Sequence, residues 1–408
     1  MNFFGIVGLF SLSFVLGLAV IYGARRFNLG ADSHQGVQRF HTHWVPRLGG
    51  VPIFLSLALW ILLVVEEIQP DFQRSLLWVL CLTPAFAIGL AEDLTEKVGS
   101  WPRLITTMGG AALAWWLLDA QVVRLGLSPL DAWLAATPIA SLLVTMLFVG
   151  GAAHSVNIID GYNGLASSYA LVVLFAILIV AGQVQDIRLV YTAAGAIAAT
   201  LGFFVLNFPS GRLFLGDSGA YLLGTVLAFL LTLLVYRNPE VSPMFAAVLL
   251  VYPVWETLFS IYRKKFLRGT SPMQPDGVHL HMLLYKRLVR TNVDVGSGKR
   301  KIYMNSATTL YTLGLSTLMA VVGLSLWENT FALLCAFWLF IGGYLMLYFS
   351  LVRFRTPRQL SLRAAWLSGD IRAAPNAVFA TGAERRSGGR TSHEPSTVIT
   401  TPTTPAEH

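Results

Sequence analysis

Residues 164–182 read GLASSYALVVLFAILIVAG, an apolar run without a charged side chain. A helix needs about 20 apolar residues to cross the hydrocarbon core of a bilayer, so this run is typical of a transmembrane helix. The next two runs, at 187–206 and 213–235, are similarly apolar. Repeated segments of this kind predict a chain that folds in lipid rather than in water.

Eleven such segments are found along the chain. They lie near 3–23, 48–66, 75–91, 104–119, 136–154, 164–182, 187–206, 213–235, 242–262, 304–325 and 329–352. The composition agrees, because 55% hydrophobic and 12% charged residues over 408 positions are too apolar for an ordinary soluble domain. We expect an all-α fold, a polytopic transmembrane helix bundle over 1–352, and a tail over 353–408 that is disordered from about 387, where Ser, Thr, Pro and Arg dominate.

The basic residues indicate the orientation of the bundle. If the N-terminus lies outside, the loops 24–47, 92–103, 155–163, 207–212 and 263–303 and the tail share one side, which holds 25 of the 29 Lys and Arg residues. Basic loops resist translocation, so this side is expected to be the cytoplasm, with the C-terminus inside. The uncharged start, followed by Arg25 and Arg26, is the reverse of a signal peptide, so the first run is expected to remain as a helix. These loops account for the net charge of +8 without nucleic-acid binding.

Four motifs fall at the expected cytoplasmic ends of the spans, where charged groups are costly and need an explanation. In GLAEDLTEKVGSWPR, residues 89–103, Glu92 and Asp93 are adjacent at the end of a span. Paired carboxylates suit a hard cation or proton transfer from a phosphate. A helix end that emerges into water is an equally good explanation of this motif alone.

The second motif is SVNIIDGYNGLASS, residues 155–168. Asn157 and Asp160 share a face of a helical turn, and Gly161 and Gly164 allow a close approach of backbone to a ligand. Such a loop is often only a connector. The near absence of Lys and Arg from a cytoplasmic loop favours a site here.

The third motif is FPSGRLFLGDSGAYLLG, residues 208–224, in which Asp217 lies between Gly216 and Gly219. This carboxylate could hold Mg²⁺ against a diphosphate, with backbone N–H groups reaching the same oxygens. Phe214 could stack on a nucleobase. The alternatives are a helix cap for Asp217 and an ordinary core or lipid-facing position for Phe214.

The fourth motif is PDGVHLHMLLYKR, in which His279 and His281 point to the same side of an extended segment. Imidazoles could bind a sugar or a phosphate, whereas a zinc site would be short of ligands. The basic run at 263–268 is explained by attraction to anionic lipid. A weaker segment, QRFHTHWVPRLGGVPIF at 38–54, offers Arg39, His41, His43 and Arg47, which could meet a lipid phosphate or serve as ordinary inner anchors.

The chain resembles the polyprenyl-phosphate N-acetylhexosamine-1-phosphate transferases, the membrane family that contains WecA and MraY. The resemblance rests on five motifs in this order: PRLGG (46–50), ED (92–93), NIIDGYNGLA (157–166), FLGDSGAYLLG (214–224) and HLH (279–281). The resemblance implies transfer of a sugar-1-phosphate from a UDP-N-acetylhexosamine to undecaprenyl phosphate, with release of UMP. It also implies a requirement for Mg²⁺, with Mn²⁺ as a substitute. The implied location is the bacterial inner membrane, where the product would initiate an O-antigen, capsule or similar glycan.

The resemblance also implies a role for each matching residue: Asp217 as main metal ligand, Asp93 as second metal ligand, Asn157 and Asp160 at the nucleotide and diphosphate, Phe214 on uracil, and His279 and His281 at the sugar-phosphate. Two positions depart from the family pattern. Glu92 replaces the first aspartate of the acidic pair. Asn163 stands where some members carry aspartate, so a uracil contact there would be made by an amide, which both donates and accepts hydrogen bonds.

We expect direct in-line attack by the lipid phosphate, positioned or deprotonated by Glu92 or Asp93, with a covalent aspartyl-phosphate intermediate as the alternative. Within the family, the phospho-N-acetylmuramoyl-pentapeptide transferase is the rival, although that branch typically has ten helices and three consecutive histidines. A secondary transporter is the rival from another class, but it would place ionisable residues near the middle of the bilayer. The sequence leaves a homodimer open.

Overall fold

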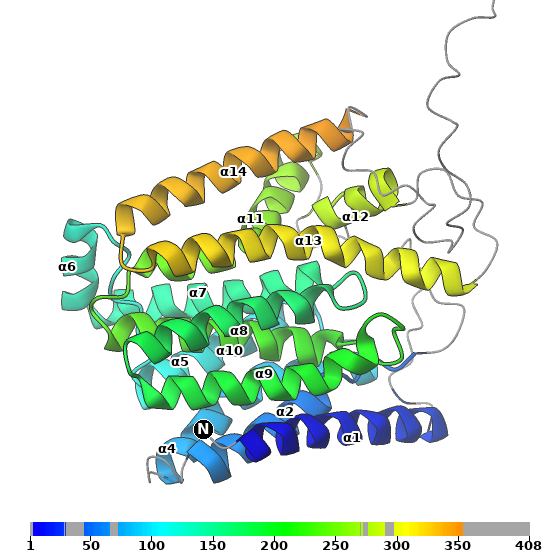
Figure 1. The fold of residues 1–408 in the computed structure, drawn as a ribbon. Coiled ribbons are helices and arrows are strands. Elements are labelled where there is room, and N and C mark those ends of the chain that lie inside the picture. Colours follow the sequence, from blue (N-terminus) through cyan, green and yellow to red (C-terminus); the bar gives the residue numbers. More distant parts are fainter. Residues whose placement is uncertain are drawn as a thin grey trace, which may run out of the picture. The chain divides into compact units, whose positions relative to one another are not determined.

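The computed structural model describes residues 3–27, 29, 45–65, 72–269, 271, 276–289 and 298–353, in which every element is a helix (Figure 1). Contacts divide the chain into 1–362 and 363–408, and all described elements belong to the first part. Arg39, His41 and His43 lie outside the described residues, as does the predicted disorder of the tail.

Each of the eleven apolar runs contains a helix over most of its described residues. The helices are α1 Phe3–Phe27, α2 Gly50–Trp60 with η1 Ile61–Val65, α4 Phe72–Thr95, α5 Ser100–Leu117, α7 Pro138–Ile159, α8 Leu165–Gln183, α9 Ile187–Asn207, α10 Gly216–Arg237, α11 Pro243–Tyr262 with η2 Arg263–Leu267, α13 Gly298–Leu326 and α14 Thr330–Val352. Two short helices, α6 Ser128–Ala136 and α12 Leu280–Leu284 with η3 Tyr285–Val289, lie between them.

Nine helices of the described chain are long and apolar enough to cross a membrane. The remaining two predicted spans correspond to the short apolar helix Gly50–Val64 and to α5, which is not among the nine. The all-α, polytopic membrane fold is therefore confirmed. Eleven crossings and the orientation of the termini stay predictions.

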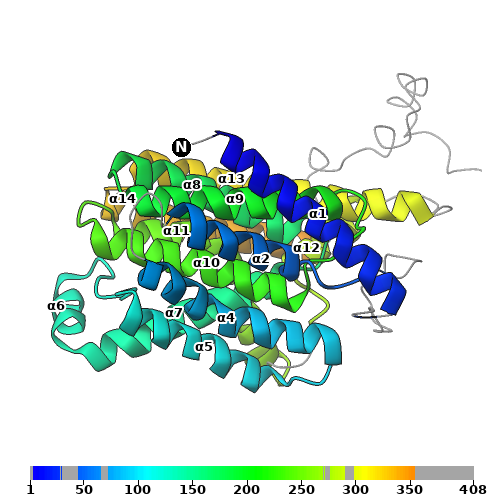
Figure 2. The same ribbon diagram turned by 90° about the horizontal axis from the view of Figure 1, so that it is seen from below.

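Helix α10 lies inside the bundle, packed against α2, α4, α7 and α8 (Figures 1 and 2). Its apolar window is 94% buried, compared with 22% for α1 and 17% for α14. A helix that is apolar on all sides is expected in such a position, because every face contacts another helix. The N-terminal end of α10 is consequently fixed by its neighbours.

Glycines let two helices reach the first turn of α10. A Cβ atom on Gly89 of α4 would lie 2.5 Å from the backbone nitrogen of Ser218, and one on Gly50 of α2 would lie 2.5 Å from that of Gly219. Small residues commonly permit such close approach between membrane helices. Gly216 has a φ of +72°, and a Cβ there would also collide with the Arg47 carbonyl, so glycine is needed at this turn.

Candidate active site

The first turn of α10 is capped by a side chain from α4. Asp93 Oδ1 accepts the backbone N–H of Asp217 at 2.8 Å, and Oδ2 accepts that of Ser218 at 2.9 Å. A carboxylate at a helix N-terminus satisfies otherwise unpaired N–H groups and interacts favourably with the helix dipole. Both Asp93 oxygens are thus used in holding Asp217 in place.

The Asp217 carboxylate is surrounded by cationic and amide donors from three other segments. Asn157, near the end of α7, donates from Nδ2 to Oδ1 at 3.0 Å. Arg47, before α2, reaches Oδ1 at 3.4 Å, and Arg103 of α5 pairs closely with Oδ2. The side chains of Asp217, Asn157 and Arg47, which the sequence motifs single out, are therefore brought together.

Glu92 contacts the same cluster through Arg103. Its Oε2 accepts the N–H of Val98 at 2.7 Å, which fixes the turn between α4 and α5. Its Oε1 lies 3.8 Å from Nη1 of Arg103. Arg103 therefore links Glu92 with Asp217, and the two acidic neighbours Glu92 and Asp93 have separate tasks.

Asp160 follows the last residue of α7. No hydrogen bond or ion pair of its carboxylate involves any residue that the structure describes. Burial raises the pKa of Asp160 to about 7; Arg47 opposes this shift, while Asp217 and Asp93 add to it. Asp160 thus lies in the electrostatic field of the other carboxylates and has oxygens available for a ligand.

The loop that follows Asp160 is fastened to α13. The N–H of Asn163 donates to Asn305 Oδ1 at 2.7 Å, and the hydroxyl of Thr309 donates to the Asn163 carbonyl at 2.8 Å. The Asn163 amide donates to the carbonyl of Pro209 at 3.2 Å. Asn163 is only 3% exposed, so this side chain holds the loop in place, and its predicted contact with uracil stays a prediction.

Phe214 lies in an extended segment that pairs with the PRLGG motif. Its N–H donates to the Pro46 carbonyl and its carbonyl accepts from Gly49, each at 2.9 Å. The carbonyl of Leu215 accepts from Gly50 at 3.1 Å. This pairing brings the segments of Arg47 and Phe214 side by side at the start of α10, and the Phe214 side chain is half-buried.

The two histidines stack on each other, and His281 packs against the loop that follows Asp160. Their rings stack with centroids 5.4 Å apart and an interplanar angle of 9°, so they point to the same side as predicted. The prediction of an extended segment was wrong, because His281 lies in the first turn of α12 and His279 directly precedes this helix. His281 is completely buried, and a Cβ atom on Gly161 would lie 3.1 Å from its Nε2. Burial, helped by the charge of His279, lowers the pKa of His281 to about 3, although Glu256 and Asp276 oppose the shift. His281 is therefore neutral at physiological pH.

Two further residues complete this end of the bundle and were not predicted. Arg103 closes the motif 89–103, so a basic residue shortly after an acidic pair was the available signal. Glu256 is a lone carboxylate inside the apolar run 242–262, and charged residues within spans usually have a function. It lies 2.9 Å from Nδ1 of His279.

The carboxylates fit Mg²⁺ as a site that the substrate completes. Across the described ranges, no group of three or more His, Cys, Asp or Glu residues could hold a metal ion by itself. Mg²⁺ does not need such a cage, because it commonly uses one or two carboxylates together with substrate phosphates and water. Asp217 and Asp160 are suitable oxygen donors. Each Asp93 oxygen accepts one backbone N–H and keeps a further lone pair, so the role of Asp93 as second metal ligand stays a prediction.

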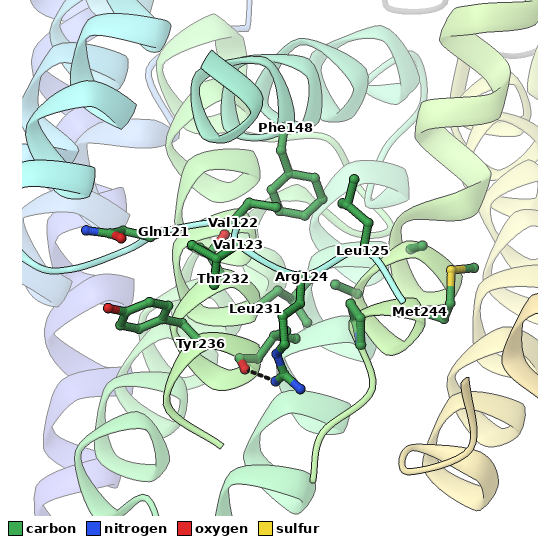
Figure 3. A pocket seen from close by; sticks show the side chains of 14 residues that line it. Gln121, Val122, Val123, Arg124, Leu125, Phe148, Leu231, Thr232, Tyr236 and Met244 are labelled. Carbon is green, nitrogen blue, oxygen red and sulfur yellow. Dashed lines mark hydrogen bonds between the residues drawn. The ribbon is translucent and has the colours of Figure 1, made fainter. Parts of the chain in front are cut away.

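An apolar pocket lies near the C-terminal end of α10, at the other end of this helix from Asp217 (Figure 3). Its lining includes Val122, Leu231 and Thr232. Arg124 lines it too, but its guanidinium donates to backbone carbonyls, including Pro239 at 2.8 Å. The pocket offers no carboxylate, so the chemistry belongs to the cluster around Asp217.

Comparison with known proteins identifies the class of this enzyme. Residues 75–235, which contain the acidic pair, the Asp160 loop and Asp217, match the model of glycosyl transferase family 4. This match, together with the relatives below, supports a sugar-1-phosphate transferase similar to the WecA/MraY-like membrane enzymes, rather than a secondary transporter.

Curated relatives give the same assignment. A probable undecaprenyl-phosphate N-acetylglucosaminyl 1-phosphate transferase of Bacillus subtilis is 25% identical over 66% of this chain and 74% of its own length. A decaprenyl-phosphate N-acetylglucosaminephosphotransferase of Mycolicibacterium smegmatis is 27% identical over 68% of this chain and 72% of its own. A phospho-N-acetylmuramoyl-pentapeptide-transferase of Levilactobacillus brevis is 23% identical over 58% and 75%, respectively.

Proposed function

We propose that this protein transfers N-acetylhexosamine-1-phosphate from a UDP-sugar to undecaprenyl phosphate, releasing UMP. The names of the Bacillus and Mycolicibacterium relatives support this reaction. The single observation that carries the proposal is the Asp217 carboxylate, held by Arg47, Arg103 and Asn157 at the N-terminus of α10. Oxygen donors and guanidinium groups together suit a diphosphate and its counter-ion.

The reaction is a phosphoryl transfer. An oxygen of the lipid phosphate attacks the phosphorus that bears the sugar, and the bond from that phosphorus to UMP breaks. Catalysis of this kind rests on holding the reactants in line and stabilising negative charge. Arg47 and Arg103 supply positive charge beside Asp217, and the helix N-terminus supplies a favourable dipole.

Direct attack suits the observed roles of the acidic pair. Asp93 caps α10 through both oxygens, so moving this carboxylate to attack phosphorus would break two hydrogen bonds that hold Asp217 in place. A phosphate monoester has its second pKa near 6, so the lipid phosphate has little need of a base at neutral pH. Glu92 then orients Arg103. Mg²⁺, or Mn²⁺ in its place, would be held by Asp217 and Asp160 and would neutralise charge on the diphosphate.

We place the reaction at the cytoplasmic face of a bacterial inner membrane. Asp93 lies in the last turn of α4, Asp160 follows α7 and Asp217 lies in the first turn of α10, so the cluster lies at the ends of apolar helices. The basic loops on the same side favour the cytoplasm. The phosphate of a membrane-anchored acceptor and a soluble UDP-sugar meet at such an interface, and the product would initiate an O-antigen, capsule or similar glycan.

The test measures UMP release by membranes that contain the protein. Asp217→Ala and Asp217→Asn are both expected to lower the rate at least about 100-fold, as loss of a key electrostatic group does. Asp119→Asn is the control: Asp119 is well exposed and pairs only loosely with Arg74 at 3.5 Å, so full activity is expected. Substantial turnover by either Asp217 variant would refute the proposed role.

A donor panel tests the substrate. Membranes supplied with undecaprenyl phosphate and several UDP-N-acetylhexosamines should yield a lipid-linked diphosphate sugar, identified by mass. A product from UDP-N-acetylmuramoyl-pentapeptide alone would assign the chain to the branch of the Levilactobacillus relative and overturn the proposal.

A further inference from the structure

Glu256 is a fully buried carboxylate in a membrane-spanning helix. It lies 2.9 Å from His279 Nδ1, accepts the N–H of Leu280 at 3.1 Å and accepts the hydroxyl of Tyr344 at 2.7 Å. Burial of a charge is costly unless hydrogen bonds compensate it, and such residues in spans usually serve a function. Glu256, on α11, therefore binds both the start of α12, next to the two histidines, and Tyr344 of α14.

The two histidines differ in their access to a ligand. Both ring nitrogens of His281 are buried and lack a hydrogen-bond partner among the described residues. The His279 side chain keeps 9% of its surface exposed, and only its Nδ1 is bonded within the part of the chain that the structure covers. His279 Nε2 is therefore the nitrogen of this pair that remains open to a ligand.

We propose that Glu256 is a positioning residue that fixes the tautomer of His279 for recognition of the sugar. A carboxylate only accepts hydrogen bonds, so a neutral His279 must carry its proton on Nδ1 and present a lone pair at Nε2. Nε2 then accepts a hydrogen bond from a hydroxyl or amide N–H of the N-acetylhexosamine. This inference rests on the proposed function, because the sugar is the donor of that reaction.

A purely structural role predicts a different outcome. Glu256 also holds the start of α12 through Leu280 and contacts Tyr344, so its loss could simply loosen this region. Glu256→Gln separates the two roles, because glutamine keeps the size and one acceptor. Its amide would donate to Nδ1 of His279 and move the proton to Nε2, which reverses the hydrogen-bonding character of the open nitrogen.

The experiment reads the tautomer directly. Full-length protein with ¹⁵N-labelled histidine, in detergent at a pH where His279 is neutral, is compared by NMR, and the His279 signals are assigned from His279→Gln. The wild type should be protonated at Nδ1 and Glu256→Gln at Nε2. Tyr344→Phe removes one hydrogen bond to the same carboxylate without touching His279, and it should leave the tautomer unchanged.

Kinetics supply the second readout. Loss of one ground-state hydrogen bond to the donor should raise the KM for the UDP-sugar about tenfold in Glu256→Gln, with kcat changed less than about threefold. Tyr344→Phe should stay within about twofold of wild type on both constants. An unchanged tautomer in Glu256→Gln, or equal losses in both variants, would overturn the proposal. Inactive wild-type membranes would instead refute the proposed function, while the NMR result would still decide the role of Glu256.

Discussion

The backbone nitrogen of Asp217 lies 2.8 Å from Oδ1 of Asp93, so the second residue of the acidic pair supports the helix that carries the central carboxylate. Its other oxygen takes the N–H of Ser218. Glu92, the neighbour of Asp93 in sequence, instead faces Arg103. Two adjacent carboxylates thus act on different structural partners.

Asp93→Asn should therefore lower stability as well as activity. The amide of asparagine would turn a donor toward one of the two helix N–H groups, so one hydrogen bond and the favourable charge at the helix end are lost. We expect a loss of about 1–2 kcal/mol, seen as a lower Tm in detergent, and a strong fall in UMP release. Inactivity with an unchanged Tm would contradict the capping role.

Gly89→Ala should separate α4 from α10. The added methyl group would lie 2.5 Å from backbone atoms of Ser218, so one helix must shift. Overpacking of this kind costs about 1–3 kcal/mol and would displace Asp217 from its partners. Gly151→Ala on α7 is the matched control, because a Cβ there meets nothing within 4 Å. Equal Tm values and equal activities for the two variants would refute the packing argument.

Arg103→Gln should lower kcat/KM about 100-fold, because a guanidinium that pairs with both Asp217 and Glu92 would be lost. Arg103→Lys should recover part of the activity, since it restores the charge but not the fork that reaches two carboxylates. Arg74→Gln removes the partly exposed pair with Asp119 and a long hydrogen bond to the Leu118 carbonyl, both away from Asp217, and should behave as wild type. Full activity in Arg103→Gln would contradict this role and show that the positive charge of Arg47 alone is enough for catalysis.

His281 should make the protein sensitive to acid. Its pKa is about 3 in the folded state and 6.5 in the absence of burial, so between these values the unfolded chain binds the additional proton. Stability should therefore fall by about 1.4 kcal/mol for each pH unit as the pH drops through this window. His281→Gln, which cannot take up a proton, should show a shallower fall of Tm between pH 6.5 and 4. Identical slopes would indicate that His281 is already protonated when folded.

Much of the fold could be predicted because a helix that crosses a bilayer needs about 20 apolar residues, and such runs can be found in the sequence. The run at 187–206 was expected as a helix and the structure gives Ile187–Asn207, whereas the run at 104–119 begins earlier, at Ser100. Hydropathy does not register the first turn of α5, because Ser100 and Arg103 are polar. The short helix α12 was not predicted, since five residues carry no periodic signal.

The site could be predicted only in part. Asp217, Asn157 and Arg47 lie in motifs at span ends, and the structure joins them. The lone carboxylate of Glu256 in an apolar run was a signal, but its partners His279 and Tyr344 are distant in sequence and could not be predicted. The orientation of the Asn163 amide toward the Pro209 carbonyl likewise depends on tertiary packing that no local pattern encodes.

The glycines around α10 also limit where this enzyme can vary. At Gly50, Gly89 and Gly216, any side chain would collide with neighbouring atoms, so these three positions, where α2 and α4 meet the start of α10, admit almost no substitution. The segment of the proposed sugar contact is less restricted at His279, which precedes α12 and keeps part of its side chain exposed. Engineering toward a different sugar should therefore begin around His279, which lies outside the close contacts between α2, α4 and α10.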